Sequence, residues 1–180
     1  MTKAFLNLDT AIGTFVFVAE CDNQPNEVSL ALETLKPQLS LPAGMSVVGC
    51  RAVVLRVATG IGVAALRWSC EAPPDVAGSP CSGEGLDAQE WEANGRLVVV
   101  GTEDEDALAA RLGFVRLDAT TSLVRYSPEK LEMKIPGVPP FTTFDLHFVL
   151  AENTLPEPVD ASAWFAVDIP HRLLTAPDAA

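Results

Sequence analysis

The two histidines and the carboxylates near them are the side chains of this sequence best suited to acid–base chemistry or metal binding. His147 lies in the run FTTFDLHFVLAE, residues 141–152, whose alternation is typical of a β-strand with one apolar face. That apolar face consists of Phe144, Leu146, Phe148 and Leu150. His147 therefore points away from the main core, beside Asp145, a carboxylate that could orient the imidazole of a general base. The polar face of a half-exposed strand is the simpler interpretation, and we expect the His147 ring to be accessible to solvent.

His171 follows a second expected strand, residues 162–170, in which Asp168 would point outward. If this strand pairs with the strand that carries His147, then Asp145, His147, Asp168 and His171 converge. Two histidines and two aspartates could bind zinc or iron. Their spacing matches no metal-binding signature, so we predict no metal site and no cofactor, and these four residues remain the candidates for catalysis.

The four cysteines, Cys21, Cys50, Cys70 and Cys81, form no C-x-x-C motif, which argues against a zinc ribbon or a thioredoxin-like site. Cys50 and Cys70 differ from the others because the hairpin expected over residues 45–71 would place them opposite each other, within reach of a disulfide. In a reducing cytosol we favour two buried thiols. Cys81 lies in a polar loop and is the best candidate for a reactive thiol, although no neighbouring group in the sequence would lower its pKa.

Motifs of several enzyme classes are missing from the sequence. It contains no G-x-S-x-G nucleophile motif and no phosphate-binding P-loop. The run GTEDED, residues 101–106, cannot bind phosphate because its acidic residues occupy the helix N-terminus where an anion would lie. These acids are better explained as favourable neighbours of a helix dipole.

Charge is the most unusual property of the chain. The net charge is −12, which argues against binding to nucleic acids and to anionic membranes. Ten acids lie between Arg67 and Arg111, opposed by Arg96 alone. We predict that this segment forms a surface for a basic protein partner, and the residues expected to bind it are Glu84, Asp87, Glu90, Trp91, Glu92, Glu103, Asp104 and Asp106. Trp91 could be the exposed anchor of that surface or a ring that folds back onto the core.

The expected elements are mostly strands. Residues 4–21 predict two strands around a turn at 9–13. For residues 25–36 we favour a helix over a strand, on the basis of length and of Glu, Leu and Ala content. Residues 45–71 predict a hairpin turning at Thr59-Gly60-Ile61, which pairs Ala52 with Trp68 and Val54 with Leu66.

Residues 72–95 predict a long acidic loop rich in Pro and Gly, with one helical turn over 86–91. A buried strand at 96–100 and a short helix should follow, with Thr102 and Glu105 forming a capping box and Gly113 ending the helix. A second hairpin should turn at residues 127–130.

Together these elements predict an α+β fold: one domain over residues 1–175, built on a largely antiparallel sheet that could be curved or barrel-like, with a frayed tail at 176–180. The order of the strands does not follow from the sequence. The chain shows no signal peptide and no apolar window long enough to span a membrane, so we expect a cytoplasmic protein.

The sequence favours a non-enzymatic acidic interaction module, such as an inhibitor, an immunity-type protein or an adaptor. A domain that binds a small molecule in an apolar pocket is the first alternative, given the many aliphatic residues. A hydrolase or metal-dependent enzyme using Asp145, His147, Asp168 and His171 is the second. The concentrated acidic segment favours the interaction module. A ligand that co-purifies with the protein would support the small-molecule binder, and bound metal would support the enzyme.

Overall fold

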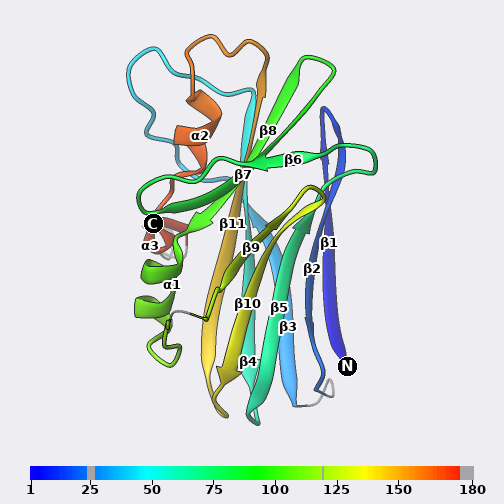
Figure 1. Ribbon diagram of the computed structural model, residues 1–180, viewed down its shortest axis with the longest axis vertical. Helices are drawn as coiled ribbons and strands as arrows, with labels where there is room; N and C mark the ends of the chain where they lie inside the picture. Colours follow the sequence, from blue (N-terminus) through cyan, green and yellow to red (C-terminus); the bar gives the residue numbers. More distant parts are fainter. Residues whose placement is uncertain (24–26, 119, 175–180) are drawn as a thin grey trace.

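The computed structural model describes residues 1–23, 27–118 and 120–174, which form two antiparallel β-sheets packed face to face in a single domain (Figure 1). The five-stranded sheet has the order β1 (Thr2–Thr10), β2 (Gly13–Cys21), β5 (Val63–Glu71), β10 (Lys130–Val138) and β9 (Val124–Ser127). The six-stranded sheet has the order β3 (Val28–Leu35), β4 (Gly49–Thr59), β11 (Thr143–Thr154), β8 (Arg96–Glu103), β7 (Leu86–Ala93) and β6 (Gly78–Pro80). The prediction of an α+β class with a largely antiparallel sheet is confirmed. Across the described residues the two sheets stay separate and do not close into a barrel.

Three short helices complete the described part of the fold: α1 (Glu105–Leu112), α2 (Ser162–Val167) and α3 (His171–Leu174). They lie on the same side of the molecule in Figure 1, and α2 contacts β8 and β11. Among the described residues the longest helix, α1, has only 8 residues, and none of the three could cross a membrane. The tail predicted at 176–180 lies outside the described residues.

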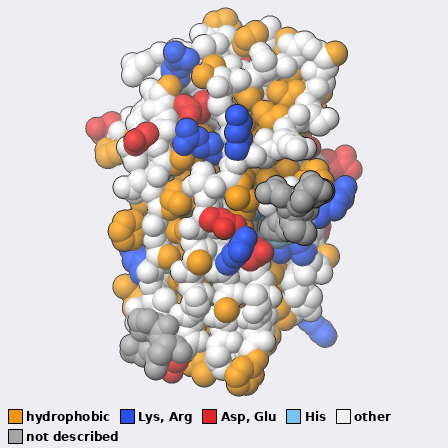
Figure 2. Space-filling view, turned by 180° about the vertical axis from the view of Figure 1, so that it is seen from behind, with side chains coloured by type: hydrophobic (Ala, Val, Ile, Leu, Met, Phe, Trp, Pro, Cys, Tyr) orange, Lys and Arg blue, Asp and Glu red, His pale blue; other side chains and the backbone are white. Residues whose placement is uncertain are grey.

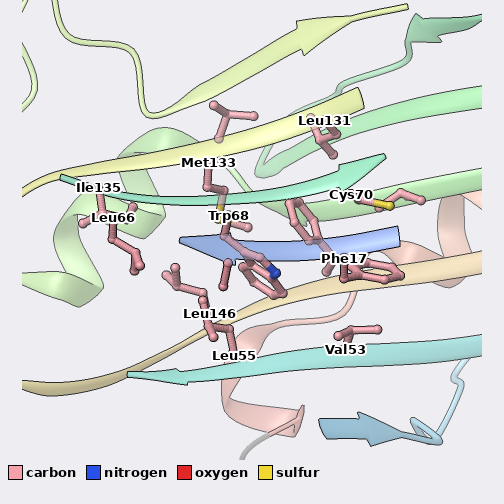
Figure 3. Close-up of a cluster of buried hydrophobic side chains, with 14 of the residues drawn as sticks. Phe17, Val53, Leu55, Leu66, Trp68, Cys70, Leu131, Met133, Ile135 and Leu146 are labelled. Atoms are coloured by element: carbon pink, nitrogen blue, oxygen red, sulfur yellow. The ribbon is translucent and has the colours of Figure 1, made fainter. Parts of the chain in front are cut away.

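The main core fills the space between the sheets. Alternate side chains of both sheets point into it, as the period of a strand requires. Figure 3 shows Phe17, Leu66, Trp68 and Met133 from one sheet meeting Leu55 and Leu146 from the other. The rings of Trp68 and Phe148 lie 4.4 Å apart. Burial of each such side chain contributes about 1.5–3 kcal/mol to folding, so this layer is the main source of stability.

A second apolar cluster covers the outer face of the six-stranded sheet. It joins side chains of β4, β7, β8 and β11 to α2, and its α2 members are Ala163, Ala166 and Val167. Gly101 on β8 allows the helix to approach, since a Cβ atom there would lie 2.8 Å from Val167. Strands β8 and β11 are thus covered on both faces, which explains their nearly continuous apolar runs.

Several local predictions are confirmed. The β1–β2 pair turns between Thr10 and Gly13, and the β9–β10 pair turns between Ser127 and Lys130. The strand predicted at 96–100 lies within β8. Helix α1 ends at Gly113, whose φ of 72° is the left-handed conformation that favours glycine.

The hairpin predicted over residues 45–71 is wrong, because β4 and β5 belong to different sheets. The link at residues 60–62 crosses from one sheet to the other. It is held by the Thr59 N–H, which donates to Thr142 O at 2.9 Å, and by the Thr59 hydroxyl, which donates to Pro139 O at 2.8 Å. The predicted pairs of Ala52 with Trp68 and of Val54 with Leu66 therefore do not exist.

The predicted opposition of Cys50 and Cys70 is wrong for the same reason. Cys50 pairs with Ala151 in the six-stranded sheet, and Cys70 pairs with Phe17 and Leu131 in the five-stranded sheet. Both cysteines are free thiols.

Four other predictions of secondary structure are wrong. Residues 28–35 form strand β3 rather than a helix, while Pro25, the expected start of that helix, lies outside the described residues. The expected loop at 72–95 contains β6 and β7, so its predicted helical turn at 86–91 is a strand. Residues 162–167 form a helix instead of a strand. Asp104, not Thr102, caps α1 by accepting a hydrogen bond from Ala107 N at 2.7 Å.

Candidate functional site

His147 is buried on the outer face of the six-stranded sheet. It occupies the face opposite to Leu146 and Phe148, as predicted. The prediction of a solvent-accessible ring is wrong, however, because only 1% of His147 is exposed. In the pairing of β8 with β11, Val149 lies opposite Gly101. If this register is continued by two residues, His147 lies opposite Glu103. The sheet thus brings an imidazole and a carboxylate together on one face.

His171 covers this position from α3. Its Nδ1 atom lies 2.8 Å from Nδ1 of His147, and the ring centroids are 5.0 Å apart. Pro170 precedes the helix, where its fixed φ suits a helix start. The sequence correctly suggested that the two histidines could converge, although His171 comes from a helix and not from the end of a paired strand.

Arg111 on α1 fixes the carboxylate of the site. Its Nε atom donates to both carboxylate oxygens of Glu103, at 2.9 and 3.0 Å, and its Nη2 also bonds Glu103. The remaining Nη1 donates to the carbonyl oxygen of Asp145 at 2.8 Å. The Glu103 side chain is only 12% exposed, so this contact is better shielded from solvent than a surface ion pair. It ties α1 to β8 and β11.

Both histidines are uncharged at neutral pH. Burial lowers the pKa of His147 to about 3, with further contributions from His171 and Arg111. Burial also lowers the pKa of His171 to about 4, with a further lowering by Arg111 that the Asp145 carboxylate opposes. Neutral imidazole is the form that offers a lone pair to a metal or a proton.

The residues brought within ligand distance differ in part from those predicted. One ligand atom each of Glu103, His147 and His171 lies within 4.8 Å of the others, and these three form the metal-ligand group found among the described residues. Asp145 is close enough to influence the pKa of His171, but it is not part of this group.

Asp168 is likewise outside the group, but it lines a cavity beside the site. The cavity has a volume of about 210 Å³. Its walls are formed by Gly85, Leu86, Glu103, Ala107, Asp168, Ile169, Pro170 and His171.

The sequence contains a signal for Glu103 that the prediction did not use: the alternation of Leu97, Val99 and Gly101 on the outer face of β8 continues to Glu103.

Comparison of the chain with protein-family models, curated proteins and solved structures found no match. The chemistry open to Glu103, His147 and His171 therefore follows from their geometry alone. Two imidazoles and a carboxylate in close contact can bind a cation or move a proton between side chains.

The residues predicted to bind a protein partner are only partly at the surface. Glu84, Glu92 and Asp106 are exposed, whereas Asp104 caps α1 and Glu103 belongs to the histidine cluster. Asp87 is half-buried and accepts a hydrogen bond from the Tyr126 hydroxyl.

Trp91 is fully buried, so its predicted role as an exposed anchor is wrong. Its Nε1 atom donates to Pro128 O at 3.0 Å, and its ring packs edge-on against Phe15 at 5.3 Å. The alternation of β7 explains this, because Gln89 and Trp91 face the core while Glu90 and Glu92 face outward.

The fold leaves most of the acidic segment without cationic partners. The described residues contain five ion pairs, of which Arg111–Glu103 alone involves an acid of residues 71–106. Burial raises the pKa of Glu90, and the nearby carboxylates of Glu92 and Glu157 raise it further. On the opposite side of the molecule from the view of Figure 1, acidic and basic side chains are interspersed (Figure 2).

Cys81, the predicted reactive thiol, is a weak nucleophile in this fold. Burial raises its pKa to about 12, and the charge of Glu90 acts in the same direction. Burial also raises the pKa of Cys50 to about 12. Because the thiolate is the reactive form, neither cysteine is activated for catalysis.

Proposed function

We propose that this protein is a non-enzymatic interaction module that binds a basic surface of a protein partner. The observation that carries the proposal is the acidic segment from Glu71 to Asp106. Its acids at 103–106 are accounted for by Arg111 and by the N-terminus of α1, but its six acids at 71–92 have no cationic partner among the described residues. Like charges held close together oppose folding. A charge arrangement that costs stability and is left unneutralised is typical of a surface that meets an opposite charge elsewhere.

The proposed contact surface is centred on the outer face of β7. Glu90 and Glu92 point outward from that strand, Glu84 lies in the turn before it, and Glu157 adds a fourth carboxylate near Glu90. The adjoining edge strand β6 has three residues and ends at Pro80, features that disfavour pairing of another strand along this edge. The partner would therefore be recognised by side-chain charge rather than by extension of the sheet.

Such a surface acts mainly on the rate of association. At physiological ionic strength the Debye length is about 8 Å, so neighbouring carboxylates act together on an approaching basic surface. Complementary charge steers the encounter and can raise the association rate by orders of magnitude at low salt.

The test compares two sets of substitutions that remove the same charge. In the first, Glu84, Glu90 and Glu92 are replaced by Gln. In the control, Asp9→Asn, Asp22→Asn and Glu33→Gln neutralise acids near β1, β2 and β3, on strands away from β7 in their sheets. Each immobilised protein is incubated with native lysate at low salt and eluted with salt. A partner should be retained by the wild type and by the control, and lost with the first set.

Equal retention by both substituted proteins would refute the surface, because it would show that only net charge matters. Absence of any salt-released partner would refute the proposal itself. The small-molecule alternative has less support, because the space between the sheets is filled by buried side chains. The cavity beside His171, about 210 Å³, is smaller than the roughly 300–1,000 Å³ of typical ligand pockets.

A further inference from the structure

Three side chains that meet at the outer face of the six-stranded sheet match a common set of metal ligands. We propose that Glu103, His147 and His171 together bind one divalent transition-metal ion, with Zn²⁺ as the reference case. They come from three different elements, β8, β11 and α3, yet one ligand atom of each lies within 4.8 Å of the others. Two histidines and one carboxylate are a known ligand set for zinc and for non-haem iron. This site is independent of the acidic surface proposed for partner binding.

The spacing of the two histidines is close to what one ion requires. Zinc–nitrogen bonds are about 2.0–2.1 Å long, so two nitrogens on a tetrahedral ion lie about 3.3 Å apart. The Nδ1 atoms of His147 and His171 are 2.8 Å apart. Since the rings would have to separate by only about half an ångström, ordinary side-chain adjustment is sufficient.

One ring nitrogen of His147 is left unpaired at a buried position. Its Nδ1 contacts His171, and its Nε2 has no hydrogen-bond partner among the described residues, although the residue is only 1% exposed. An unsatisfied buried polar atom costs about 1–3 kcal/mol. An ion bound through Nδ1 would leave Nε2 unpaired, so Nε2 is not itself the ligand; its cost indicates that packing alone does not account for a histidine here. A valine, like the buried Val54 opposite it on β4, would avoid that cost.

Arg111 limits the affinity of the site but does not block it. Its positive charge opposes a cation, and it already bonds both oxygens of Glu103. A carboxylate has about four lone-pair positions, so Glu103 can bind an ion with one and keep Arg111 on others. Metal-binding carboxylates are commonly held by such outer hydrogen bonds.

The adjoining cavity supplies access and room for water. Glu103 and His171 form part of its wall, and its volume of about 210 Å³ accommodates several water molecules. An ion with three protein ligands therefore has space for a water in its fourth position, as in open zinc sites.

The experiment uses the untagged full chain, freed of metal by chelator and then titrated with Zn²⁺ and, separately, with Co²⁺. We expect one equivalent of Zn²⁺ per chain and a Co²⁺ absorption spectrum indicating nitrogen ligands and a low coordination number. His171→Gln should weaken Zn²⁺ binding at least tenfold. Because α3 is short and the His171 side chain is half-buried, this variant should retain the fold by circular dichroism. Glu103→Gln provides a second variant.

Two controls separate this site from other carboxylates. Asp168→Asn changes a cavity residue outside the ligand group and should leave the affinity within about threefold. The variant with Glu84, Glu90 and Glu92 replaced by Gln lacks acidic side chains that could bind zinc weakly. It should still bind one equivalent of Zn²⁺ per chain, even if it no longer binds the partner. Absence of stoichiometric binding to the wild type, or binding unchanged in both His171→Gln and Glu103→Gln, would overturn the proposal.

Discussion

Replacing Trp91 by Phe tests whether this residue stabilises the fold rather than contacting a partner. The indole makes two specific contacts, the hydrogen bond from Nε1 to Pro128 O and the edge-on packing against Phe15. Phenylalanine keeps most of the apolar contact but cannot donate the hydrogen bond. Pro128 O still accepts from Gly78 N at 2.7 Å, so the carbonyl is not left unsatisfied.

The expected loss follows from these contacts. Loss of the hydrogen bond costs about 1 kcal/mol, and the smaller ring leaves a cavity that costs about another 1 kcal/mol. We therefore expect the free energy of unfolding to fall by about 2 kcal/mol. For a chain of 180 residues that loss lowers Tm by about 4–8 °C.

The assay is urea unfolding followed by circular dichroism, in parallel with the retention of a partner from lysate. Trp91→Phe should unfold at lower urea while the folded fraction retains the partner as the wild type does. A change of less than about 0.5 kcal/mol, the range of ordinary surface substitutions, would refute the assignment of Trp91 to the core. Loss of partner binding by a protein that is still folded would do the same.

Three further predictions concern charge, thiols and helix capping. Glu90 has a raised pKa, so its ionised form is less favourable in the folded protein than in the unfolded chain. This cost begins to decrease as the pH falls through the pKa of the folded state and is gone below the lower pKa of the unfolded chain. Glu90→Gln should accordingly stabilise the protein at pH 7 by a few tenths of a kcal/mol after screening, with no gain at a pH below the pKa of the unfolded chain; equal gains at both pH values in urea titrations would contradict this. Cys50 and Cys70 lie in different sheets, so mass spectrometry of the native protein after diamide treatment should find no bond between them. Asp104→Ala removes the cap of α1 and should cost about 1 kcal/mol, whereas Asp106→Ala, with no capping contact, should cost clearly less in the same urea assay.

The sequence predicted elements whose signals are local. The turns at 10–13 and 127–130 join strands that pair directly, so alternation and turn residues were sufficient. The turn at 59–61 carries the same kind of signal, but its strands enter different sheets, because pairing with β11 and β10 outweighs pairing of β4 with β5. Turn residues show that the chain reverses, and they do not determine which partner a strand takes.

Strands β6 and β7 lie in the region 72–95 that the sequence predicts as a loop, because its polar composition hides the alternation of a strand. In LDAQEWEA the buried Gln89 and the outward Glu90 and Glu92 make an eight-residue strand look like a polar loop. A different ambiguity occurs at residues 162–169. Phe165, Val167 and Ile169 alternate as in a strand, whereas Ala163, Ala166 and Val167 have the spacing of one helix face. Packing on the outer face of β8 and β11 selects the helix.

The sequence predicts the strand face of His147 and its approach to His171, but not the burial of the site or the presence of Glu103. Alternation correctly put Asp145 and His147 on the face away from the main core, and the convergence with His171 was anticipated. The burial of His147 was not, because it depends on the covering segment around α3, which sequence periodicity does not locate. Glu103 was assigned to a charged surface, and only the pairing of β8 with β11 reveals it as a neighbour of His147.

The crossing at residues 60–62 has a consequence for how the chain folds. Strands β4 and β5 diverge into opposite sheets, and so do β10 and β11, which pair with them in turn. The molecule therefore contains two stacked arches, bonded at their bends through Thr59 and Thr142. Ala52 on β4 and Val149 on β11, which are opposite each other where the two arches pair, are 97 residues apart along the chain. Closing such distant contacts is slow. Because each arch contributes a strand to both sheets, the two sheets are coupled through the chain, and we expect the sandwich to unfold in a single cooperative transition.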